Sequence, residues 1–323
     1  MSLKKVLACI KRNNNFLITT HTNMEGDALG SVLAFYRLIK ILGKQGIVIN
    51  EDVIPYGYEF LPGVDSVKRL KKELWKVKFD CFVTLDCSEL RRCGQVYKLN
   101  LDKRPILNID HHISNTKFAD VNWVDPQAAS CTQMIYQLYK KLRIPLDRKI
   151  ATLLYVGILT DTGSFHYTNT TSFTHKMVSE LLSYGLDVAR IYKNIYENIP
   201  FSNLQLLSRI LPTLSCSNSG RVVWFQIRRN MLKDQKICFD LSEQILSFGR
   251  VIKGVEVVAL FKENLKNKNE IRVNLRSQGK VDVNKIAAYF SGGGHKTASG
   301  ITICGNIDQV TKKVLGKIKE SLE

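Results

Sequence analysis

The chain has 323 residues, with 47 lysines and arginines against 29 aspartates and glutamates, and so a net charge of +18. Its 45% hydrophobic content excludes intrinsic disorder, and its length predicts two domains. No apolar run reaches the ~18–20 residues of a membrane span, and charges in residues 1–12 exclude a signal peptide. The eight cysteines contain no CxxC pair. We therefore expect a cytoplasmic protein with reduced cysteines and no membrane partner, whose basic surface permits a polyanionic ligand.

The first half of the chain alternates short apolar runs with helical patterns. Strands are predicted at 15–20, 46–50, 79–86 and 105–110. Helices are predicted at 1–12 and 27–43, in the lysine-rich segment before residue 79, and at 128–142, 148–159 and 172–196. Strands separated by helices predict an α/β domain with a mostly parallel sheet flanked by helices, which we place at residues 1–190.

The pattern changes after a connecting helix that ends near Leu211 and Pro212. Beyond it, strands are predicted at 222–227, 255–261 and 270–275, and helices at 242–248, 283–290 and 307–322. This arrangement predicts a smaller α+β domain at residues 216–323. A helical linker or hinge is expected at residues 191–215.

Aspartates and histidines gather where the predicted strands of the first domain stop. His21 and Asp27 follow the first strand, Asp86 ends the third, Asp110-His111-His112 ends the fourth, and Asp161 leaves an apolar helix. Ligands of open α/β sheets bind outside the carboxyl ends of the strands, so these segments are expected to converge on one crevice. Each motif alone is usually structural, but four such segments together favour a metal site. Carboxylates mixed with imidazoles suit Mn²⁺, and less well Mg²⁺, and two such ions can activate a hydroxide against a phosphoryl group.

Two motifs resemble a known family. Asp110-His111-His112, together with the segment His21–Ser31, resembles the DHH phosphoesterase superfamily. The segment Gly292–Gly300, with Arg276-Ser277 upstream, is similar to the DHH-associated domain of that family. The likeness covers nearly the whole chain and is greatest to the oligoribonucleases and 3′-phosphoadenosine 5′-phosphate phosphatases. It implies an active-site cleft between the two domains.

The resemblance also implies roles for individual residues. One Mn²⁺ would be held by His21, Glu25 and Asp86, and the other by Asp27, Asp86, His111 and Asp161, with Asp86 bridging and with Mg²⁺ or Co²⁺ as substitutes. Asp110 would orient the histidines, and His112 would face the scissile phosphate as a catalytic group. The substrate phosphate would be bound by Arg276, Ser277, Gly292, Gly293, Gly294 and His295. Glu25 departs from the family pattern, which usually has aspartate there, although the longer side chain can still reach a metal.

These features predict a Mn²⁺-dependent phosphoesterase. It would hydrolyse short single-stranded oligoribonucleotides, linear diadenylate included, to mononucleotides, and would convert 3′-phosphoadenosine 5′-phosphate to AMP through a hydroxide activated by two metals. The alternatives are a cyclic-dinucleotide phosphodiesterase or a manganese pyrophosphatase and, from another class, a non-catalytic nucleotide-binding regulatory protein. A monomer or homodimer is expected, and the sequence indicates no protein partner.

Overall fold

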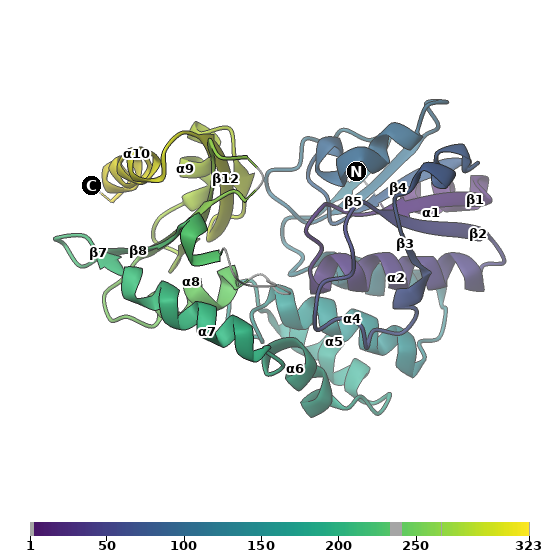
Figure 1. Ribbon diagram of the computed structural model, residues 1–323. Helices are drawn as coiled ribbons and strands as arrows, with labels where there is room; N and C mark the ends of the chain where they lie inside the picture. The colour runs from purple at the N-terminus through teal and green to yellow at the C-terminus, as the bar shows by residue number, and fades with distance from the viewer. Residues whose placement is uncertain (1–2, 233–240, 266, 323) are drawn as a thin grey trace. The chain divides into compact units, whose positions relative to one another are not determined.

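A computed structural model describes residues 3–232, 241–265 and 267–322 of the chain (Figure 1). The chain divides into two compact units, Met1–Asn198 and Ile199–Glu323. The helices α6 (Val188–Tyr196) and α7 (Phe201–Ile210) lie on either side of this boundary, within the region where the sequence places the linker. Across the described ranges, no helix is long and apolar enough to cross a membrane.

The first unit is built on a six-stranded sheet in the order β3-β2-β1-β4-β5-β6, with every pairing parallel. Its strands are β1 (Asn15–Thr19), β2 (Gln45–Asn50), β3 (Val67–Arg69), β4 (Cys81–Leu85), β5 (Ile106–Asp110) and β6 (Val121–Val124). Its other α-helices are α1 (Leu3–Arg12), α2 (Gly26–Ile41), α3 (Cys131–Leu142), α4 (Arg148–Asp161) and α5 (Ser172–Leu182). The predicted α/β class is therefore confirmed.

The central strands are apolar along nearly their whole length because both faces of the sheet are buried. All five residues of β4 are buried, as parallel sheets with two covered faces require. The helix α2 is also apolar around most of its surface, since it packs against both α3 and α4. Gly30 lets α2 approach α4 closely, because a Cβ there would lie 2.5 Å from the Leu153 carbonyl oxygen.

One local prediction was wrong, two strands were missed, and one predicted helical stretch is divided. The lysine-rich segment before residue 79 does not form the predicted helix. It contains only the short 3₁₀ helix η2 (Lys72–Lys76), because its partly buried apolar side chains pack onto the sheet and hold the connecting segment against it. The strands β3 and β6 were not predicted, since three or four residues carry no periodic pattern. The predicted helix 172–196 is two helices, α5 and α6, because the chain turns at Gly185, where φ is +72°.

The second unit holds a six-stranded mixed sheet in the order β11-β12-β10-β9-β8-β7. The pairing of β8 with β9 is parallel and the others are antiparallel. Its strands are β7 (Ser215–Cys216), β8 (Val222–Ile227), β9 (Val257–Glu263), β10 (Glu270–Ser277), β11 (Gly293–Gly294) and β12 (Ala298–Cys304). Its remaining α-helices are α8 (Ser242–Arg250), α9 (Val283–Tyr289) and α10 (Ile307–Glu320). The predicted α+β unit is confirmed, although β7, β11 and β12 were not predicted.

Candidate active site

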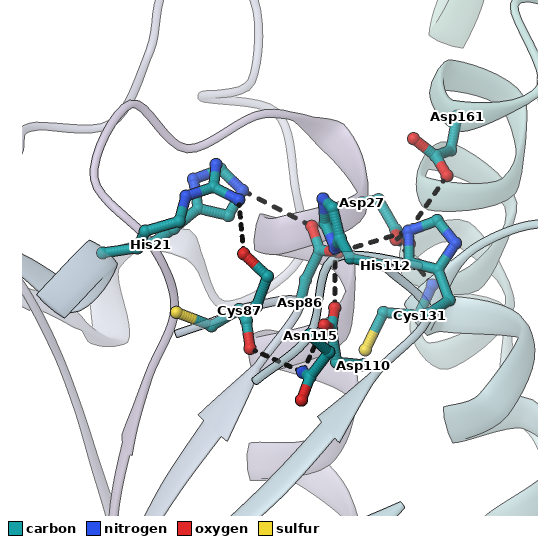
Figure 2. Close-up of polar contacts among 12 residues, drawn as sticks. His21, Asp27, Asp86, Cys87, Asp110, His112, Asn115, Cys131 and Asp161 are labelled. Atoms are coloured by element: carbon teal, nitrogen blue, oxygen red, sulfur yellow. Dashed lines mark hydrogen bonds and ion pairs between the residues drawn. The ribbon is translucent and has the colours of Figure 1, made fainter. Parts of the chain in front are cut away.

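Acidic and imidazole side chains from four segments meet at the carboxyl edge of the parallel sheet (Figure 2). His21 follows β1, Asp86 follows β4, and Asp110 ends β5 directly before His111 and His112. Two helices add Asp27, in the first turn of α2, and Asp161, the last residue of α4. Within this group Asp27, Asp86 and Asp110 are 0–2% exposed. Carboxylates this deeply buried require compensating positive charge or hydrogen bonds.

Asp86 lies at the centre of this group. Its Oδ2 is 3.5 Å from His21 Nε2, and its Oδ1 is 3.4 Å from His111 Nε2. Two sets of ligand atoms therefore share it: His21 with Glu25 and Asp86, and Asp27 with Asp86 and His111, each set lying within 4.8 Å of one another. The structure thus brings five of the six residues predicted to hold two metal ions into two adjoining sets that have Asp86 in common.

Asp161 lies beside the second set. Its Oδ2 is 3.3 Å from His111 Nε2, while Asp27 Oδ2 is 3.8 Å from the same nitrogen. The His111 ring therefore faces oxygens of three carboxylates, those of Asp27, Asp86 and Asp161.

Backbone carbonyls set the tautomers of His21 and His111, whose Nε2 atoms face Asp86. His21 Nδ1 is 2.7 Å from the Thr22 carbonyl oxygen, and His111 Nδ1 is 3.2 Å from that of Ala128. Because a carbonyl oxygen only accepts, each Nδ1 carries a proton, and the Nε2 atom, which would hold a lone pair in a neutral ring, faces carboxylate oxygens. Such lone pairs repel one another unless a proton or a cation lies between them. The donor set therefore fits divalent cations bound by imidazole and carboxylate.

The pKa shifts of these residues also indicate that the buried carboxylates have too little positive charge around them. Burial, together with the charge of Asp86, raises the pKa of Asp27 to about 6, and burial raises the pKa of Asp161 well above its usual range. Burial opposes a charge on His111, yet the carboxylates of Asp161, Asp86 and Asp27 hold its pKa well above normal. Burial likewise works against ionised Asp86, whose pKa is nevertheless held well below normal by hydrogen bonds from His111 and His21. Without a metal ion, protonated histidines therefore neutralise the buried carboxylates, and a bound cation would take over this role.

The N-terminus of α3 holds the Asp27 carboxylate. Asp27 Oδ2 accepts from the Cys131 amide at 2.6 Å, and its Oδ1 accepts from the Thr132 amide at 2.9 Å and the Thr132 hydroxyl at 2.8 Å. Backbone amides at a helix N-terminus are favourable partners for a negative charge. Gly157 of α4 makes room for this contact, because a Cβ there would lie 2.3 Å from Thr132 Cγ2.

A second chain of hydrogen bonds orients His112. Asp110 Oδ1 lies 2.7 Å from His112 Nδ1, and Asp110 Oδ2 accepts from Asn115 Nδ2 at 2.6 Å. Asn115 Nδ2 also lies 2.9 Å from Asn108 Oδ1. Burial opposes ionisation of Asp110, but the neighbouring His112 keeps its pKa below normal. The Asp110 carboxylate is therefore ionised and holds a proton on His112 Nδ1.

Two of the segments that carry site residues contain a residue with a left-handed backbone conformation. Asp86 has a φ of +54° directly after β4, a strained geometry for a residue with a side chain. Asn23, between His21 and Glu25, has a φ of +58°, and its amide donates to Asp52 Oδ2 at 2.6 Å. Glu25 itself is exposed and is the N-cap residue of α2, without a side-chain capping bond. Its carboxylate is accordingly directed to the His21 and Asp86 set rather than to its own helix.

The residues predicted to bind substrate phosphate lie in the second unit. Arg276 and Ser277 end β10, and Arg276 is paired across the sheet with Ala298 of β12. The predicted glycine run adjoins the same strand, because Gly293 and Gly294 form β11 and pair with Gly300 and Ser299. The structure thus brings these motifs to neighbouring places in one sheet.

Contacts within the second unit already engage parts of this region. The Arg276 guanidinium forms an ion pair with Glu243 of α8, and the buried Ser277 hydroxyl accepts from the Gly279 amide at 3.0 Å. The His295 carbonyl oxygen accepts from the Ser299 hydroxyl at 2.8 Å. Gly292 is required sterically, since a Cβ there would lie 2.3 Å from the Gly300 carbonyl oxygen.

Three residues of the site were missed by sequence reasoning. Thr132 and Asn115 hold Asp27 and Asp110, and Asp52 holds the loop that carries Glu25. A signal was present for Asn115, which stands three residues after His112 in the same loop. None was present for Thr132 or Asp52, whose partners lie 105 and 29 residues away.

Comparison with known proteins agrees with the geometry. Residues 15–158 match the model of the DHH family, N-terminal domain, and residues 234–320 match that of the DHHA1 domain. The chain is 32% identical over 310 residues to the bifunctional oligoribonuclease and PAP phosphatase NrnA of Thermus thermophilus, covering 94% of this chain and 89% of that protein. It is 29% identical over 301 residues to the probable protein of the same name from Streptococcus mutans, covering 93% of each chain.

A solved structure shows the same fold. The crystal structure of an exopolyphosphatase-related protein from Bacteroides fragilis superposes with a TM-score of 0.86 at 24% identity, covering 98% of this chain and 95% of that one. The matched domains, the relative from Thermus thermophilus and the buried aspartate–histidine group point to one assignment. The chain belongs to the DHH family and is a phosphoesterase, a hydrolase of phosphate esters.

Proposed function

We propose that this phosphoesterase hydrolyses short single-stranded oligoribonucleotides to mononucleotides and removes the 3′-phosphate of 3′-phosphoadenosine 5′-phosphate, with two Mn²⁺ ions per site. The observation that carries the proposal is the sharing of Asp86 between two sets of ligand atoms. The names of the relatives from Thermus thermophilus and Streptococcus mutans, which give both activities, support the substrate classes.

The cations would be held by residues already near one another. His21, Glu25 and Asp86 would hold one ion, and Asp27, Asp86, His111 and Asp161 the other. Bound divalent cations lower the pKa of water and neutralise charge on a phosphoryl group. The protein contributes imidazoles with fixed Nε2 atoms and the buried Asp27 carboxylate, which helix amides and the Thr132 hydroxyl hold in place.

His112 would act on the substrate itself. Because Asp110 holds the proton on Nδ1, the opposite nitrogen, Nε2, is the one that would stabilise the phosphate or give a proton to the leaving oxygen. Arg276, Ser277 and the Gly292–His295 loop would bind the terminal phosphate through a guanidinium and backbone amides. Arg276 would have to exchange Glu243 for the substrate phosphate, as the present ion pair engages it.

A substrate panel tests the proposal. Purified protein would be freed of metal with EDTA, reloaded with Mn²⁺, Mg²⁺ or Co²⁺, and given linear diadenylate, a five-nucleotide RNA, 3′-phosphoadenosine 5′-phosphate, cyclic diadenylate and pyrophosphate. We expect Mn²⁺-dependent loss of the first three, and none with Asp86→Ala. Preference for cyclic diadenylate or pyrophosphate would replace the proposed substrates with one of the alternatives. Nucleotide binding without turnover of any substrate would instead indicate a regulatory protein.

A further inference from the structure

A strongly cationic segment lies outside the site described above. Residues 68–78 contain six cations and a single carboxylate, Glu73, so that 6 − 1 gives a net charge of +5 over eleven residues. We name these six residues the cationic strip: Lys68, Arg69, Lys71, Lys72, Lys76 and Lys78. All six are exposed, and in the described ranges none of them forms an ion pair. Their charge is therefore available to a ligand.

The apolar residues of this segment face the sheet, which leaves the side chains of the cationic strip exposed. Leu70, Leu74 and Val77 are partly buried and pack onto the apolar cluster on one face of the sheet, which includes Phe82. Leu74 therefore points inward from η2, and Val77 does so from the extended residue that follows it. In a 3₁₀ helix residues three apart share a face, so Lys72 and Trp75 of η2 lie on one face, where Trp75 is 39% exposed.

A groove runs beside the strip. It has a volume of about 280 Å³ and is lined by Lys68, Arg69, Lys71, Glu73 and Leu74. Three of these five residues are cations, so positive charge surrounds the groove.

The strip begins beside the catalytic edge of the sheet. Arg69 is the last residue of β3 and is paired with Asn50 at the carboxyl end of β2. The Asn50 side chain donates to the His21 carbonyl oxygen at 3.2 Å, and Arg69 Nε donates to the Glu51 carbonyl oxygen at 3.3 Å. Arg69 therefore lies at the same edge of the sheet as the buried site.

We propose that the cationic strip binds the backbone of single-stranded RNA outside the buried site, with Trp75 stacking on a base. Cations interleaved with an exposed aromatic ring are the usual surface for single strands. Lysine on an edge strand also prevents pairing between sheets, which explains Lys68 but neither the cations of η2 nor the exposed Trp75. The identity of the polyanion as RNA rests on the proposed function.

Binding measurements with matched variants test the proposal. The strip variant would carry Lys→Gln at 68, 71, 72 and 76, and the control variant Lys→Gln at 4, 5, 149 and 176, which are also exposed lysines of the first unit. Both lose four charges. The probe is a labelled 12-nucleotide single-stranded RNA with phosphorothioate linkages, followed by fluorescence anisotropy with Mn²⁺ present.

We expect the strip variant to bind the RNA at least 10-fold more weakly at low salt, and the control variant to bind like the wild type. The slope of log affinity against log salt should fall by about 3 in the strip variant, at about 0.7 per neutralised phosphate. Trp75→Ala should weaken binding by about 5-fold or more, and Trp75→Phe should retain most of it. Hydrolysis of linear diadenylate, too short to reach the strip, should be unchanged in all of these variants.

Other results would overturn the proposal. Equal RNA binding by wild type, strip variant and control variant would remove the strip as a site, and equal weakening of both variants would show that only net charge matters. Competition by polyglutamate as effective as by RNA, with no effect of Trp75→Ala, would replace RNA by polyanions in general. If the strip variant alone loses binding while the wild type hydrolyses no RNA, the proposed function fails and the strip stands.

Discussion

Asp110 and His112 are joined by a contact of 2.7 Å between Oδ1 and Nδ1, and both are buried at the end of β5. The contact fixes which nitrogen of His112 carries its proton, and Asn115 supports it by donating to the second oxygen of Asp110 at 2.6 Å. The last residue of β5 and a residue of the loop that follows it thus orient one imidazole.

Removing the Asp110 charge tests this relationship. In Asp110→Asn the side chain keeps its shape but no longer stabilises one tautomer of His112, so we expect kcat to fall about 10–100-fold with bound metal unchanged. Asn115→Ala should have a smaller effect in the same direction, because Asp110 keeps its charge and loses one donor. The measurements are steady-state kinetics across pH and metal content by mass spectrometry. Loss of bound metal in either variant would show a structural role instead.

Glu25 should be a working metal ligand despite its departure from the family pattern. Its carboxylate lies in one set with His21 and Asp86, so Glu25→Asp should retain activity and Glu25→Ala should lose most of it. The difference should be greatest when Mn²⁺ is limiting, since a missing ligand weakens affinity before it affects the saturated enzyme. Activity would be measured over a Mn²⁺ titration. Wild-type behaviour of Glu25→Ala at limiting Mn²⁺ would exclude this side chain from the metal site.

Gly157 should be essential for the approach of α3 to Asp27. A Cβ there would lie 2.3 Å from Thr132 Cγ2 and 2.7 Å from Asp27 Oδ1, so Gly157→Ala should destabilise the fold by about 1–3 kcal/mol and weaken metal binding. Gly316 in α10 is the matched control, because its Cβ would meet nothing within 4 Å, and Gly316→Ala should stabilise by about 0.5–1 kcal/mol. Urea unfolding and Mn²⁺ titration measure both effects, and equal results for the two variants would contradict the steric argument.

Asp80 should contribute stability that depends on pH. Its Oδ2 accepts from the amides of Asn14 at 3.0 Å and Asn15 at 2.9 Å, and these hydrogen bonds, the one from Asn14 foremost, lower its pKa below the usual 3.8. A lowered acid pKa stabilises the fold above the unfolded value, and that stability is lost as pH falls through the folded pKa. Asp80→Asn should therefore be less stable than wild type at pH 7, by about 1 kcal/mol.

The pH series separates this effect from a general loss of charge. The difference between wild type and Asp80→Asn should be constant from pH 7 to about 5 and shrink below pH 4, as followed by urea unfolding. Asp102→Asn serves as the control, because the Asp102 side chain is 75% exposed and its variant should match wild type throughout. A gap between wild type and Asp80→Asn that persists at pH 3 would mean that the carboxylate charge is not what matters.

Apolar runs in the sequence predicted the buried strands and helices well. The strands β1, β2, β4 and β5 and the helix α2 were predicted to within a few residues, because buried parallel strands and core helices are long enough to carry a pattern. The strands β3, β6, β11 and β12 were missed, since they are short or rich in small and polar residues and are held by pairing with distant neighbours. The segment before Phe79 has helical composition, yet its apolar side chains serve as anchors on the sheet.

The sequence by itself indicated which residues gather at the candidate site, because aspartates and histidines at the ends of apolar strands are recognisable from position alone. The tertiary structure alone decided how they are held. Thr132 reaches Asp27 across 105 residues, and Gly157 makes room for it from a third helix. Asp86 becomes the shared carboxylate because β4 lies between β1 and β5 in the sheet, an order that differs from the order along the chain. Hydrogen bonding and close packing act through space, so these relationships carry no signal at short range in the sequence.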